Sequence, residues 1–102
     1  MIPSMRGGSP EVVNNHELRR FEIRIGDEVA QLTYKVRGSA IELIHTEVPL
    51  DLEGQGFGNE LARAALEYAA AQKLEVIPSC SFLRSYMRRH SGQEKLTERT
   101  DD

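Results

Sequence analysis

Residues 45–68, with the sequence HTEVPLDLEGQGFGNELARAALEY, decide the fold of this chain. An apolar run leads into a short loop, the loop carries glycine at positions 54, 56 and 58, and an alanine-rich sequence follows at once. Glycine accepts a positive φ and lets the backbone approach a ligand closely. Successive N–H groups in such a loop, together with the positive end of the helix dipole, attract an anion. The stretch therefore predicts a strand, a loop and a helix N-terminus that bind a phosphorylated ligand.

The glycine loop differs from two other phosphate-binding motifs. No Gly-Lys-Ser/Thr follows it, as a P-loop requires, and the G-x-G-x-x-G spacing of dinucleotide-binding folds is absent. A tight strand-to-helix turn without any ligand would use the same glycines, and the sequence leaves that alternative open.

Two strands are predicted before the loop. Apolar and polar residues alternate over 21–25 and again over 30–36, which is typical of half-buried strands. Glycine-containing turns at 26–27 and 37–39 favour antiparallel hairpins. Residues 12–13 either begin the first of these strands or form a short strand of their own.

The third strand and the helix after it form a βαβ unit. Residues 41–48 carry apolar side chains on both faces, so we expect this strand to be central and covered on both sides. Pro49 ends it because proline lacks a donor for the ladder. The alanine content predicts a helix over 57–73, and the β-branched run 74–77 predicts a strand that Pro78 stops. These two strands should be parallel, with a right-handed crossover.

A second helix is predicted over residues 81–90. Ser79 or Ser81 can cap its N-terminus, and Gly92 is a suitable stop after its C-terminus.

Length and composition indicate one globular domain. The chain has 102 residues, which suits a single core, and we expect a disordered leader over 1–10, the domain over 11–92 and a polar tail over 93–102. The net charge of −3 argues against nucleic-acid binding by bulk electrostatics. No apolar run is long enough for a membrane span, so we expect no membrane partner.

The cysteine and histidine content argues against a disulfide-bonded protein and against a metal-binding protein. The single cysteine rules out an internal disulfide and, without a signal-like segment, indicates a cytoplasmic protein. No cluster of histidine and cysteine has metal-ligand spacing, so no metal is expected. We expect a monomer.

The order of elements resembles the GNAT superfamily of acetyl-CoA-dependent N-acetyltransferases. In that superfamily the loop has the pattern Gln/Arg-x-x-Gly-x-Gly/Ala, and Gly56 and Gly58 match its two small positions, whereas Glu53 stands where Gln or Arg is usual. Four segments resemble the small YjdJ-type GNAT-like proteins more closely, a group that includes the N-acetyltransferase-domain-containing proteins of eukaryotes. The segments are HTEVP (45–49), EGQGFG (53–58), LARAALEYA (61–69) and PSCSFLRSYMRRH (78–90), within a resemblance that covers about residues 12–91.

The resemblance implies a fold and a cosubstrate. The fold is α/β (more strictly α+β), a minimal GNAT-like arrangement with a mixed, mainly antiparallel sheet and two main helices. The cosubstrate is acetyl-CoA, whose pyrophosphate the loop amides hold and whose pantetheine arm enters between the splayed central strand and its parallel neighbour. The implied CoA contacts are Val48, Gly54, Gln55, Gly56, Phe57, Gly58 and Asn59.

Two residues at the end of the central strand are candidates for a general base. Transfer to an amine requires the ammonium form to lose a proton, and Glu47 or His45 could accept it directly or through water. Strict alternation places both side chains on the same face of the strand. The alternatives are that His45 is a buried, hydrogen-bonded strand residue and that Glu47 is a solvated strand end.

Two residues near the last helix are candidates for roles at the thioester. Cys80 precedes a helix N-terminus, which can lower a thiol pKa, and we expect it to lie beside the thioester rather than to carry the acetyl group. It could equally be a small buried apolar residue. The resemblance implies that Tyr86 protonates the departing CoA thiolate, and the alternative is that it belongs to the core.

The last helix also has a basic face formed by Arg84, Arg88 and Arg89. This face is either a solvated surface or the source of one contact to a CoA phosphate.

The sequence thus predicts an acetyl-CoA-binding protein that acts as an N-acetyltransferase. The acceptor is an unidentified amine, on a small molecule or a protein. The alternative function is a non-catalytic CoA-binding or protein-interaction module, which the small size of the chain favours.

Overall fold

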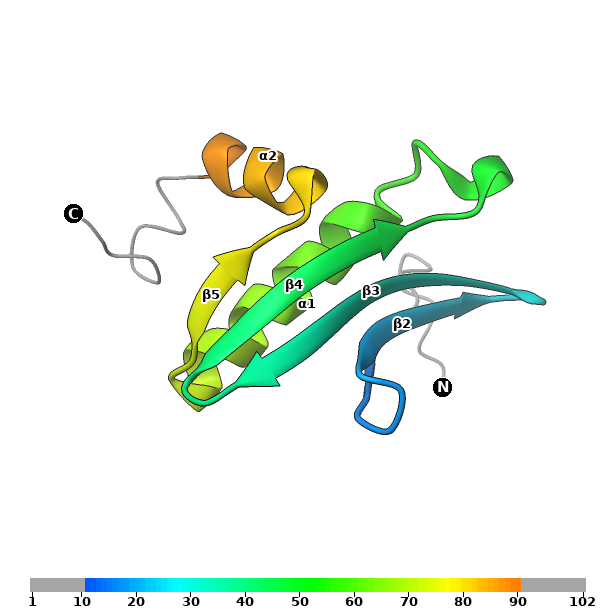
Figure 1. The fold of residues 1–102 in the computed structure, drawn as a ribbon. Coiled ribbons are helices and arrows are strands. Elements are labelled where there is room, and N and C mark those ends of the chain that lie inside the picture. The colour runs from blue at the N-terminus through cyan, green and yellow to red at the C-terminus, as the bar shows by residue number, and fades with distance from the viewer. Residues whose placement is uncertain (1–10, 91–102) are drawn as a thin grey trace.

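A five-stranded sheet with two α-helices forms the domain in the computed structural model, which describes residues 11–90 (Figure 1). The elements are β1 (Val13–Asn15), β2 (Arg20–Ile25), β3 (Glu28–Arg37), β4 (Ala40–Glu47), the 3₁₀ turn η2 (Leu50–Leu52), α1 (Phe57–Gln72), β5 (Glu75–Pro78) and α2 (Ser81–Arg89). The strand order is β1-β2-β3-β4-β5; β1 to β4 pair antiparallel, and β5 pairs parallel to β4. The predicted α/β fold, with a mixed, mainly antiparallel sheet, is confirmed.

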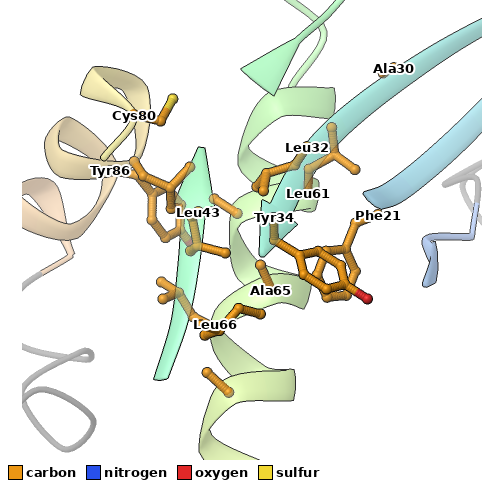
Figure 2. Close-up of a cluster of buried hydrophobic side chains, with 14 of the residues drawn as sticks. Phe21, Ala30, Leu32, Tyr34, Leu43, Leu61, Ala65, Leu66, Cys80 and Tyr86 are labelled. Carbon is orange, nitrogen blue, oxygen red and sulfur yellow. The ribbon is translucent and has the colours of Figure 1, made fainter. Parts of the chain in front are cut away.

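Both helices pack on one face of the sheet and enclose a single core (Figure 2). Every second side chain of β2 and β3 points into this core, which matches the alternation in the sequence. From α1 the core takes leucines and several alanines, and the small alanines let the helix lie close to the strands. The largest fully buried side chains are Ile23, Leu32, Ile41, Leu43, Leu61 and Leu83.

The expected second covering layer over β4 is wrong for the described residues 11–90. Both α-helices lie on the same face, and Ile44 is 38% exposed. The pairing of β3 with β4 shifts from Thr33↔His45 to Tyr34↔Leu43, so Ile44 is the extra residue of a β-bulge. The apolar residues on both faces of this strand therefore reflect a bulge and not burial on two sides. We call the face of the sheet opposite the helices the outer face.

The two parallel strands, β4 and the edge strand β5, differ in length, and this opens one end of the sheet. Pairing between β4 and β5 stops at Leu43↔Pro78, whereas β4 continues to Glu47. Beyond this point the two strands diverge, and the chain after β5 turns into α2 (Figure 1).

Two details of the predicted ends need correction. Pro78 is the last residue of β5 rather than the residue after it, which an edge strand permits. The N-cap of α2 is Cys80, and neither Ser79 nor Ser81 caps the helix. Of the two alternatives for residues 12–13, the separate short strand is the one observed, because β1 begins at Val13. Gly92, the expected leader 1–10 and the expected tail 93–102 lie outside the described residues.

Glu22 is a buried charged residue on the outer face, with only 3% of its surface exposed. Its carboxylate accepts hydrogen bonds from Arg20 Nε at 2.5 Å and from Asn15 Nδ2 at 3.0 Å, and Arg24 Nη2 lies 3.6 Å from it. Burial acts to raise the pKa of Glu22, but these partners outweigh burial and hold the pKa below its ordinary value.

This carboxylate makes the stability of the fold sensitive to acid. Because its pKa is lower in the folded than in the unfolded protein, its contribution is complete above the unfolded pKa and is lost as pH falls through the folded pKa. We expect Glu22→Gln to lower the unfolding free energy at neutral pH by about 1–3 kcal/mol. Urea unfolding over a pH series should also show a shallower loss of stability below about pH 5 for the variant. Parallel pH profiles for the two proteins would contradict this role.

Candidate functional site

The loop between η2 and α1 contains two glycines with left-handed backbone angles. Gly54 has φ 86° and Gly56 has φ 89°, and Gly56 is the N-cap of α1. Side chains with a Cβ rarely adopt these angles, so glycine is required for this path of the chain. The sequence prediction of a glycine-dependent turn into a helix agrees with this geometry.

The backbone donors of this loop lie at the start of α1. Within residues 11–90, the N–H groups of residues 54–59 donate to no protein acceptor, and the first helical hydrogen bond runs from Glu60 N–H to the Gly56 carbonyl at 3.0 Å. These donors lie where the positive end of the α1 dipole is located. We call residues 54–59 the amide loop. Its free donors favour an anionic ligand.

Gly58 has a different role from the other two glycines. It belongs to the first turn of α1, and a Cβ at this position would lie 2.9 Å from Cζ of Phe82 on α2. The missing side chain therefore lets the start of α1 pack closely against α2. The sequence did not predict this packing role of Gly58, because the position of α2 depends on the tertiary fold.

A cleft of about 560 Å³ opens between the end of β4, the amide loop and α2. This volume is typical of small-molecule sites. All the predicted CoA contacts line it except Gln55, whose exposed side chain instead donates to the Asp51 carbonyl at 3.5 Å. The lining residues are Thr46, Val48, Leu52, Glu53, Gly54, Gly56, Phe57, Gly58, Asn59, Phe82 and Arg89. The cleft therefore joins apolar walls to the donors of the amide loop.

One arginine of the predicted basic face reaches the cleft. Arg89 Nη2 donates to Asn59 Oδ1 at 3.3 Å, which brings the end of α2 to the start of α1. Arg84 instead donates to the carbonyls of Pro78 and Ser79, and Arg88 lies against Ser85. Of the three arginines, Arg89 is therefore the one that could meet an anion bound at the amide loop.

Thr46 is a cleft residue that the sequence did not indicate. It pairs with the buried Leu32 and so faces the helices, and its Oγ1 lies 3.5 Å from Sγ of Cys80. Strict alternation from Leu43 would turn Thr46 outward, but the bulge at Ile44 reverses the sequence of faces. The sequence shows no pattern that marks a one-residue bulge, so the inward direction of Thr46 could not be predicted from it.

Cys80 is held close to the cleft by its own backbone and by Thr46. The N–H groups of Ser79 and Cys80 both donate to the Leu43 carbonyl at 3.1 Å, and 9% of Cys80 is exposed. Burial acts to raise the pKa of the thiol, but hydrogen bonding, with Thr46 the main contributor, holds the pKa below its ordinary value.

Glu47 and His45 lie on the outer face, away from the cleft. Their register partners are Gln31 and Thr33, and both side chains are exposed. Gln31 Nε2 donates to Glu47 Oε1 at 3.0 Å, and Thr33 Oγ1 donates to the His45 carbonyl at 3.3 Å. The two candidate bases thus share a face, as predicted, and this face is opposite the one that Thr46 occupies.

Tyr86 is part of the core (Figure 2). Only 4% of its surface is exposed, it does not line the cleft, and its ring stacks on His90 with centroids 4.1 Å apart. This burial favours the packing interpretation that the sequence left open.

Metal-binding clusters and membrane-spanning helices are both absent from residues 11–90. This part of the chain contains no group of three or more histidine, cysteine, aspartate or glutamate residues arranged to hold a metal ion. None of its helices is long and apolar enough to cross a membrane.

Comparisons with known proteins identify similar sequences and a similar fold. A protein-family model described as GCN5-related N-acetyl-transferase matches residues 20–96. The Protein NATD1 of Mus musculus is 31% identical over 86 residues, which cover 81% of this chain and 78% of that protein. The Protein NATD1 of Homo sapiens is 30% identical over 91 residues, which cover 85% and 80% respectively. A solution structure of a GCN5-like putative N-acetyltransferase from Staphylococcus aureus superimposes with a TM-score of 0.64 at 30% identity, covering 80% of this chain and 81% of that one.

Proposed function

Because this chain belongs to the family of GCN5-related N-acetyltransferases, we propose that it binds acetyl-CoA in the cleft and transfers the acetyl group to an amine. The free N–H groups of residues 54–59, which open onto the cleft at the start of α1, carry this proposal. Donors of this kind fit a diphosphate, and Arg89 adds a cation at the same end. The apolar lining from Val48, Leu52 and Phe57 suits the pantetheine arm.

The thioester of acetyl-CoA supplies the acyl carbon that the amine attacks. Thr46 and Cys80 lie where the end of β4 meets the cleft, so we place the thioester beside them. The thiol of Cys80 borders this position without accepting the acetyl group, because direct transfer to an amine requires no protein thiol. We keep the Tyr86 hydroxyl as the candidate for protonating the leaving thiolate; the ring that carries it is packed in the core.

Glu47 is the proposed general base, and His45 is the second candidate for the same step. An ammonium acceptor must lose a proton before it can attack, and a carboxylate can take that proton directly or through water. Glu47 is exposed on the outer face at the end of β4, so the acceptor would approach from the face opposite the cleft.

Thermal unfolding with acetyl-CoA, followed by an acceptor screen, tests this function. Acetyl-CoA at about 100 times its dissociation constant should raise the unfolding free energy by about 2.7 kcal/mol. Release of free thiol in the presence of alkylamines, lysine peptides or whole proteins should then identify acceptors. The absence of any stabilisation at millimolar acetyl-CoA would contradict the proposal. Stabilisation without turnover of any acceptor would instead favour a non-catalytic CoA-binding module. Such a module would fit the outer face, which has no helical layer within residues 11–90 to form an acceptor pocket.

A further inference from the structure

The carboxylate of Glu47 has two oxygens in different situations. Oε1 accepts the hydrogen bond from Gln31 Nε2, at 3.0 Å, across the β3–β4 pair. Oε2 has no hydrogen-bond partner in the part of the chain that the structure describes. One oxygen is thus fixed by the sheet, while the other can accept a hydrogen bond from a ligand on the outer face.

The side chain of Gln31 that makes this contact also contains an unsatisfied buried oxygen. Its Oε1 is buried and accepts no hydrogen bond from residues 11–90. A buried acceptor without a donor is unfavourable for folding, and such groups in native proteins call for a specific explanation. An apolar side chain of the same length at position 31 would avoid the penalty. The presence of glutamine at position 31 is therefore better explained by the hydrogen bond that its Nε2 donates to Glu47 than by a contribution to the stability of the sheet.

The neighbouring strand does not compete for that donor. Gln31 lies between Glu22 on β2 and Glu47 on β4, its two register partners. The carboxylate of Glu22 is already bound by Arg20, Arg24 and an asparagine. An ionised carboxylate only accepts hydrogen bonds, so the amide can serve Glu47 solely through Nε2, which fixes the orientation of the amide.

We propose that Gln31 is a positioning residue for acetyl transfer: it holds Oε1 of Glu47 and thereby directs Oε2 toward the N–H of an ammonium acceptor. This inference rests on the proposed function, with Glu47 as the base. It predicts that Gln31 affects acceptors that must be deprotonated and has little effect on acceptors that are already neutral. A base that takes the proton of the ammonium before attack is needed only for the former; a neutral amine attacks without this step, and its N–H proton can leave later with the departing thiolate.

The test compares Gln31→Met with wild type, using a lysine-containing peptide and hydroxylamine as the two acceptors. The peptide amine is protonated at neutral pH, whereas hydroxylamine is largely neutral. We expect kcat/KM for the peptide to fall about tenfold, less than for loss of the base itself, with the hydroxylamine rate unchanged. The melting temperature should be equal to or above that of wild type because the orphaned oxygen is removed. Lys35→Met, on the same face of β3, is the control and should leave both rates unchanged.

A double variant separates positioning from an independent effect. Gln31→Met should cause no further loss in a Glu47→Gln background, since the partner that Gln31 holds is already altered. Full additivity, or an equal loss with both acceptors, would overturn the inference. A wild-type rate for Gln31→Met in an active protein would overturn it while leaving the proposed function intact. A wild-type protein that binds acetyl-CoA but acetylates no acceptor of the whole screen would overturn the transferase proposal and this inference with it.

Discussion

Gly56→Val should lower the affinity for acetyl-CoA about 100-fold or more while the protein stays folded. Gly56 has φ 89°, which a β-branched residue adopts only with strain, and relief of this strain turns the neighbouring N–H groups away from the cleft. Loss of two charge-assisted hydrogen bonds at about 1.5 kcal/mol each accounts for the expected factor. Isothermal titration with acetyl-CoA measures it directly.

Gly38→Val is the matched control for this experiment. Gly38 also has a left-handed angle, φ 60°, and no atom lies within 4 Å of the position that a Cβ would take, but it belongs to the turn between β3 and β4. Both variants should lose stability of about 1–2 kcal/mol from backbone strain. Wild-type affinity should remain for Gly38→Val alone. Equal affinities for the two variants would show that the amide loop does not hold the ligand.

Glu47→Gln should lower kcat/KM for an alkylamine acceptor about 100-fold. The substitution keeps the size of the side chain and removes the group that takes the proton. Affinity for acetyl-CoA should stay unchanged, since Glu47 lies on the outer face and the cleft opens on the opposite one. Steady-state release of free thiol at saturating acetyl-CoA provides the measurement.

Cys80→Ala gives the contrasting outcome in the same assay. Its rate should stay within about twofold of wild type, as expected for a thiol that borders the thioester without entering the reaction. A large loss for Cys80→Ala together with a wild-type rate for Glu47→Gln would assign the chemistry to the thiol and contradict the base proposal.

Local chemistry in the sequence was sufficient to predict the βαβ unit and the loop within it. The glycines at 54 and 56 are required by backbone angles that few other residues adopt, and the alanines of α1 combine helix propensity with close packing. Alternation over β2 and β3 likewise follows from burial on one face. These features depend on neighbours within a few residues, which explains why they could be predicted.

The direction of side chains at the end of β4 could not be predicted in the same way. One bulged residue, Ile44, exchanges the faces of all residues after it, so Thr46 enters the cleft and Glu47 leaves it. The choice of Arg89 over the other two arginines of α2, and the contact of Gly58 with Phe82, depend on how α2 packs against α1. Such relations join residues far apart in the sequence and have no local signal.

The central claim is that the amides of residues 54–59 hold the diphosphate of acetyl-CoA. Titration of ¹⁵N-labelled protein with acetyl-CoA and, separately, with acetyl-pantetheine, which lacks the diphosphate, tests it by following backbone amide resonances. We predict that acetyl-CoA causes its largest shifts at residues 54–59 and that acetyl-pantetheine leaves these resonances in place. Loop resonances that stay unchanged with acetyl-CoA at saturation, while other parts of the chain shift, would contradict the claim.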